Sequence, residues 1–250
     1  MRAHLTLPLV LVLGAGCQNT GAENDPLIPD ELVRRAVQLT STLSLVAAET
    51  ALVAADPPEG FSTCPAVDED GNQFTYTYEA CVPDSSLTED ALSGTITLTV
   101  AGGSGAFTGS ITGLGVGENT VTAAVQGSSS TAGDLLNVDI DFSDGVWVPA
   151  GRDLPFDAFV ELQGNADEVS AFVDSALLQA ENGEDLFFDV EDVTTPRGTM
   201  GTCSVPSGGA IDLFGDVGRS GVIFNEDNNA SGSFTATHND RDPSTIVLCP

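Results

Sequence analysis

Apolar side chains recur along residues 32–54 at alternating spacings of four and three. The positions in this line are Leu32, Ala36, Leu39, Leu43, Val46, Thr50 and Val53. Neighbouring Val and Ala residues widen the line into a stripe, which is typical of an amphipathic helix with one buried face. Asp30 and Glu31 place negative charge where the helix dipole favours it, and Pro57 and Pro58 cannot continue a helix. We therefore predict a helix over residues 30–56, packed within its own domain rather than in a coiled coil, because charged pairs do not flank the stripe.

After the prolines, the pattern changes to alternation of apolar and polar residues. The alternating segments and the shorter strand candidates after them are residues 73–81, 93–101, 136–142, 210–214, 221–224, 231–237 and 245–249. Turn-forming Gly, Asn and Asp residues lie at 70–72, 102–105, 115–119 and 144–145. A period of two with one polar face indicates antiparallel strands that cover a core on one side. The predicted fold class is mainly β: a large antiparallel meander sheet or flattened barrel over residues 60–250, with one long N-terminal helix packed against it.

Residues 166–181 fit both a helical face and a strand. An internal repeat favours the strand, because Ser143 to Asp157 aligns without a gap with Ser175 to Asp189. The first copy contains Val146-Trp147-Val148, which is strand-like, so Leu177-Leu178-Gln179 is expected to be a strand as well. Each copy is then one strand–turn–strand unit.

The chain is strongly acidic, with 37 Asp and Glu against 7 basic residues and a formal net charge of -30. Such a surface repels phosphate backbones, so we expect no nucleic-acid partner. It also repels anionic lipid headgroups, so attachment to a membrane needs a covalent or apolar anchor. The charge suits an acidic, soluble face, and attraction of cations or basic partners is the alternative interpretation.

The N-terminus carries an export signal. Residues 1–16 contain one early Arg and an apolar run from Leu5 to Leu13, which is too short to span a membrane. Gly14-Ala15-Gly16-Cys17 resembles the lipobox of bacterial lipoproteins, although Gly14 stands where Leu is usual. The resemblance implies lipid modification of Cys17, and Gln18 after it implies the outer membrane or cell surface of a Gram-negative-type bacterium. An ordinary secretory signal, giving a periplasmic or secreted protein, is the alternative.

Residues 17–29 then form a lipid-anchored, flexible tether, because the segment is short, polar and interrupted by Pro26 and Pro29. The four remaining cysteines are an even number in an exported chain, which indicates two disulfides with three possible pairings. We choose Cys64–Cys81 and Cys203–Cys249, because each pair brackets a compact strand-rich segment.

Motifs for catalysis are missing from the sequence. Only His238 remains after the signal peptide, and neither G-x-S-x-G nor H-E-x-x-H nor a P-loop occurs. His238 precedes a polar segment that is typical of a solvated turn, so we do not assign it as a catalytic base. We therefore expect no catalytic residues. A glycan hydrolase that uses paired carboxylates stays open as an alternative.

Calcium is the one cofactor that the sequence suggests, through two clusters of oxygen ligands. The residues are Asp68, Asp70 and Asn72 in one cluster and Asn225, Asp227 and Asn229 in the other. Neither cluster has the Gly and Glu of a calcium-binding loop in the right place, so both are interpreted as hairpin turns. We expect an exported, non-enzymatic lipoprotein that serves as a surface-structural or partner-binding module, with an unknown protein or glycan partner.

Overall fold

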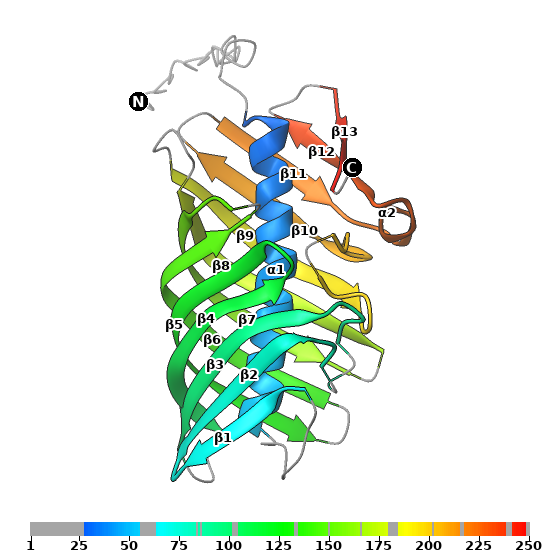
Figure 1. Cartoon of the computed structure of the whole chain (residues 1–250). Coiled ribbons are helices and arrows are strands. Elements are labelled where there is room, and N and C mark those ends of the chain that lie inside the picture. Colours follow the sequence, from blue (N-terminus) through cyan, green and yellow to red (C-terminus); the bar gives the residue numbers. More distant parts are fainter. Residues whose placement is uncertain are drawn as a thin grey trace, which may run out of the picture.

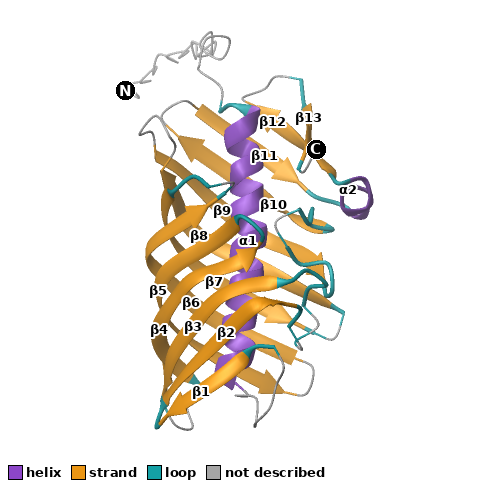
Figure 2. Cartoon of the chain, viewed as in Figure 1, coloured by secondary structure: helices purple, strands orange, loops and turns teal. Residues whose placement is uncertain are grey.

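The computed structural model describes residues 28–55, 64–83, 85, 87–101, 105–132, 135–149, 151–165, 167–179, 185–201, 203–215, 218–238 and 242–248. These residues form one long helix, one short helix and a 13-stranded antiparallel sheet (Figures 1 and 2). The predicted fold class is therefore confirmed.

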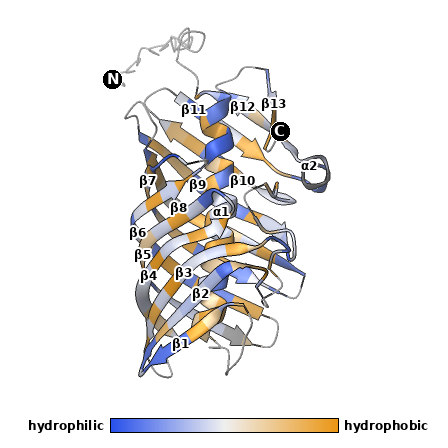
Figure 3. Ribbon diagram, in the orientation of Figure 1, coloured by the Kyte–Doolittle hydropathy of each residue, from blue (hydrophilic) through white to orange (hydrophobic). Residues whose placement is uncertain are grey.

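Each strand pairs with the strands before and after it in the sequence, from β1 to β13. The strands are β1 (Ala66–Asp70), β2 (Gln73–Cys81), β3 (Leu92–Val100), β4 (Ala106–Val116), β5 (Asn119–Ala132), β6 (Leu135–Val148), β7 (Leu154–Gly164), β8 (Glu168–Gln179), β9 (Asp185–Pro196), β10 (Gly208–Gly215), β11 (Gly218–Ile223), β12 (Ser233–His238) and β13 (Ser244–Val247). Apolar residues alternate with polar ones along the strands (Figure 3), so that one face meets the core and the other meets water.

Helix α1 (Asp30–Ala55) runs along the inside of this sheet and packs against β3 to β8 and against β13 (Figure 1). Of its 26 residues, 18 are buried, and every residue from 39 to 51 is buried. The prediction of a single buried face is therefore wrong, because the whole circumference of α1 is covered over these turns. Buried hydroxyl groups are tolerated here because they bond within the helix, as when Thr40 donates to the carbonyl of Ala36 at 2.9 Å and Ser44 to that of Thr40 at 2.8 Å.

The sheet curls far enough around α1 for its opposite rims to meet. Successive connections of a meander alternate between the two rims, so the β2–β3 and β9–β10 connections belong to opposite rims. Nevertheless, the carbonyl of Leu87 in the first accepts hydrogen bonds from the backbone N–H groups of Gly198 and Met200 in the second, at 2.9 and 3.2 Å. Thr88 and Thr199 form an isolated β-bridge beside them. These contacts close the sheet over the side of α1 that the strands leave open.

Residues 168–179 form strand β8, so the interpretation favoured by the repeat is confirmed. Each copy of the repeat contains the end of one strand and the start of the next, β6 with β7 and β8 with β9. The turn predicted at Asp144-Gly145 is wrong, because both residues lie inside β6 at a bulge. Asp144 has a φ of 51°, and a side chain on Gly145 would clash with the ring of Phe156, so the Asp-Gly pair serves a bulge here rather than a turn.

The hairpin turn predicted at Asn225 to Asn229 is also wrong, because the segment begins the short helix α2 (Glu226–Ser231). Asn225 directly precedes this helix, Glu226 and Asp227 lie in its first turn, and Gly232 follows it with a φ of 66°. These are the residue types that favour helix starts and ends, and they also favour turns. The pattern alone therefore does not separate the two structures.

Candidate functional site

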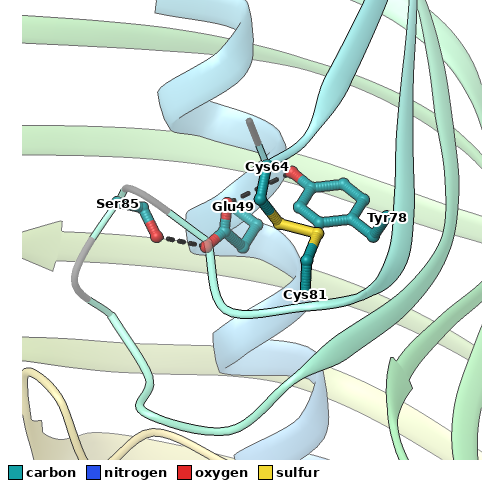
Figure 4. The surroundings of a disulfide bond; sticks show 5 residues. All are labelled: Glu49, Cys64, Tyr78, Cys81 and Ser85. Carbon is teal, nitrogen blue, oxygen red and sulfur yellow. Dashed lines mark hydrogen bonds between the residues drawn. A yellow bond between two sulfur atoms is a disulfide. The ribbon is translucent and has the colours of Figure 1, made fainter. Parts of the chain in front are cut away.

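Glu49 is a carboxyl group near the C-terminal end of the enclosed part of α1, and it is only 1% exposed. An ionised carboxylate accepts hydrogen bonds and donates none, so it needs donors from outside its own helix. Tyr78 on β2 donates its hydroxyl to Glu49 Oε2 at 3.3 Å, and the hydroxyl of Ser85, in the β2–β3 connection, donates to Oε1 (Figure 4). Three segments distant in sequence therefore converge on one buried acid.

Burial governs the protonation of this cluster. Because an ionised carboxylate loses its hydration inside the protein, the pKa of Glu49 rises from 4.5 to about 7, and the hydrogen bonds from Ser85 and Tyr78 only partly oppose the rise. Burial also raises the pKa of the Tyr78 hydroxyl, and the neighbouring Glu49 charge raises it further. Glu49 is thus a proton-binding group that titrates near neutral pH.

The Cys64–Cys81 disulfide lies beside the Glu49 cluster (Figure 4), and its Cα atoms are 5.9 Å apart. The first predicted pairing is therefore confirmed. It holds the segment before β1 against the end of β2, close to Tyr78 and Ser85. Cys203 is also disulfide-bonded, but Cys249 lies outside the described residues, so the second pairing stays a prediction.

A second polar cluster surrounds His238, the last residue of β12. Its Nδ1 lies 2.8 Å from the hydroxyl of Ser220 on β11, and its Nε2 lies 3.0 Å from Asp30 Oδ1 and 3.1 Å from the Ser244 hydroxyl. Ser244 also donates to Asp30 Oδ1 at 3.1 Å. His238 itself is 5% exposed, and residues 239–241 of the predicted solvated turn lie outside the described residues. The cluster joins the first residue of α1 to the last strands of the sheet.

Ser220, His238 and Asp30 are the residue types of an acyl-transfer triad, but their placement does not suit nucleophilic attack. Ser220 is 5% exposed and lies in mid-strand on the inward face of β11. A substrate carbonyl would have to enter the core to reach its hydroxyl. The Ser244 hydroxyl lies within hydrogen-bond distance of both His238 Nε2 and Asp30 Oδ1. Both ring nitrogens of the imidazole therefore have partners, Ser220 at Nδ1 and Asp30 with Ser244 at Nε2. The arrangement fixes the N-terminus of α1 against β11, β12 and β13.

The candidate calcium ligands of the first cluster lie on a hairpin. Asp68 and Asp70 are exposed on β1, Asp70 pairs with Gln73, and Gly71 and Asn72 make the two-residue turn to β2. This part of the interpretation is confirmed. Within the described part of the chain, no three Asp, Glu, His or Cys side chains are grouped so that they could hold a metal ion. The side chain of Asn229 lies outside the description.

Sequence reasoning missed Glu49, Ser220 and Asp30 as members of polar clusters. Glu49 did leave a signal, because it follows Leu45 by four positions and precedes Val53 by four, so it shares a helix face with apolar residues. Its hydrogen-bond partners Tyr78 and Ser85 are 29 and 36 positions away, so no local pattern shows them. Ser220 and Asp30 left no signal, because the contacts to His238 span 18 and 208 positions.

The predicted lipidation site, Cys17, lies outside the described residues. Within those residues, α1 alone has the length and apolar character to cross a membrane, and 89% of its most apolar stretch is buried in the domain. Compared with protein-family profiles, with curated proteins and with solved structures, the chain matches none.

Proposed function

We propose that this chain is an exported lipoprotein, anchored through Cys17 in the outer membrane, whose β domain is a non-enzymatic surface-structural or partner-binding module. The observation that supports it best is the enclosure of α1. Among the described residues, α1 is the one helix long and apolar enough to cross a membrane, and it is buried in the core of the domain, so it is not free to anchor the protein. An acidic domain of this kind needs a separate anchor to stay at a membrane, and the lipobox-like residues 14–17 would supply one.

The position of α1 also suits a tether. Its first residue, Asp30, contacts His238 at the end of the domain formed by β12 and β13 (Figure 1). Residues 17–29 would therefore join the domain at this end. The outer face of the sheet would be left facing solvent, where a partner can reach it.

The alternative, a glycan hydrolase with paired carboxylates, is less well supported. The register places Asp189 opposite Asp212 and Asp139 opposite Glu161 on the outer face. Side chains opposite one another on adjacent strands project in the same direction. Glycosidases instead hold their two carboxyl groups on either side of the bond that is cleaved. Glu49, whose pKa would suit a general acid, is enclosed in the core.

Metabolic labelling with an alkyne analogue of palmitate tests the anchor. We expect label on the wild type and none on Cys17→Ala, because the thiol is the acceptor. Gln18→Asn is the matched control and should keep both the label and the outer-membrane location. Gln18→Asp should keep the label but move the protein to the inner-membrane fraction. Equal labelling of the wild type and Cys17→Ala would refute the anchor.

A further inference from the structure

An apolar row crosses the outer face of the sheet. The register places Leu177 on β8 opposite Phe187 on β9, and Phe187 opposite Phe214 on β10. Leu186 and Phe188, on either side of Phe187, point into the core, so the row points outward. Phe187 is 47% exposed. Large apolar side chains in register on a solvent face are a feature of interaction surfaces.

Carboxylates border this row on both sides. On β9, Asp185 and Asp189 lie two positions before and after Phe187, and both are exposed. Asp189 is opposite Asp212 on β10, and Asp157 on β7 is opposite Leu177 at one end of the row. The exposed Phe187 ring therefore lies among acidic side chains whose charge a cationic ligand would complement.

At the Phe214 end of the row, the protein already holds a cation over an aromatic ring. Arg219 on β11 is opposite Phe214, and its guanidinium carbon lies 4.5 Å from the centre of the Phe214 ring. A cation over an aromatic face is attracted by the ring quadrupole. The exposed ring of Phe187, between two carboxylates, offers a cation or an apolar group a comparable position.

We propose that the row Leu177, Phe187 and Phe214 binds a cationic amphipathic helix of a partner protein. The row runs across the strands, which are about 4.8 Å apart, and an α-helix presents one side chain of a given face about every 5.4 Å. A helix lying along the row would place apolar side chains on it and Lys or Arg on each side, facing Asp185 on one side and Asp212 on the other. This inference rests on the proposed binding function and names its face and class of partner.

The test uses the full mature protein and a fluorescent peptide of Leu and Lys with Leu at helical spacing, followed by fluorescence anisotropy. We expect binding that weakens with salt, because salt screens the carboxylates. Phe187→Ser should weaken it by about tenfold, the effect of removing a central aromatic contact. The double variant Asp185→Asn with Asp212→Asn should weaken binding severalfold and reduce its salt dependence.

Matched controls separate this surface from general attraction to an acidic protein. Leu135→Ser removes a 55% exposed apolar side chain elsewhere, and Asp68→Asn with Asp70→Asn removes two charges from β1, so both should bind the peptide as the wild type does. Equal losses in the controls, or equal binding of a peptide in which Leu and Lys alternate, would overturn the proposal. A dimer in sedimentation that Phe187→Ser abolishes, without peptide binding, would assign the row to a second copy of the chain and would also overturn it. The labelling experiment on Cys17 does not involve the row. A failure of the lipid anchor and a failure of peptide binding can therefore be told apart.

Discussion

Replacing Glu49 by Gln should remove a pH dependence that is built into the core. The folded protein holds the Glu49 proton up to about pH 7, whereas the unfolded chain releases it near pH 4.5. Folding is therefore coupled to proton binding between these values, and stability must fall as the pH rises through this range. The contribution is fully present below pH 4.5 and is lost by about pH 7. Above that pH it no longer changes.

The size of the effect follows from the same pKa values. At about 1.36 kcal/mol per pH unit, a rise from 4.5 to about 7 corresponds to about 3 kcal/mol of unfolding free energy. Gln is close in shape to Glu, and it can accept a hydrogen bond from one of the Tyr78 and Ser85 hydroxyls through its oxygen and donate to the other through its NH2 group, but it has no proton to lose. The wild type should therefore lose about 3 kcal/mol relative to Glu49→Gln between pH 4.5 and 7.

Urea unfolding followed by tryptophan fluorescence measures this difference. Trp147 is the single Trp of the chain and is fully buried, so its emission reports the opening of the core. Urea is preferred to guanidinium chloride, because an added salt would screen the net charge of -30. Glu118→Gln, in the exposed β4–β5 turn, is the control and should follow the wild type at every pH. Parallel stability curves for the wild type and Glu49→Gln would refute the reasoning, since Glu49 would then be ionised or hydrated in the folded protein.

Two further changes test the contacts around the helix. Replacing Cys64 and Cys81 together by Ala should lower the unfolding free energy by about 3 kcal/mol. This is the loop-closure value for a sequence separation of 17. An unchanged urea midpoint would contradict this. His238→Ala should lower the unfolding free energy by about 1 to 3 kcal/mol, because it leaves buried Ser220 without its partner. Ser244→Ala, at the edge of the same cluster, should lower it less. The reverse order in urea unfolding would show that Asp30 and Ser244 hold the helix without the imidazole.

The parts of the fold that depend on local pattern could be predicted from the sequence. Strand β2 begins and ends at the predicted residues, and its alternation correctly places Tyr76 and Tyr78 on the inward face. The helix prediction succeeded for the same reason, since Leu39 and Leu43 are buried as the spacing indicates. These features arise from periods of two and of 3.6 residues, which are visible in any short window.

The enclosure of α1 could not be predicted, because it depends on contacts between opposite rims of the sheet. Thr40 and Ser44 look like a polar face in the sequence, yet they satisfy their hydroxyl groups within the helix and are buried. Asp144-Gly145 was misassigned because the positive φ that suits a turn also suits a bulge. The His238 cluster depends on the pairing of β11 with β12 and on the N-terminus of α1, and no local pattern encodes those contacts.

The central claim is that the sheet encloses α1, and hydrogen–deuterium exchange read by mass spectrometry tests it most directly. Residues 39–51 have no exposed side chain, so their amides should exchange only when the sheet itself opens. We expect peptides from this segment to be protected as strongly as peptides from β5 to β7, which cover it. Exchange of residues 39–51 well before those strands, as for a helix on a surface, would contradict the account.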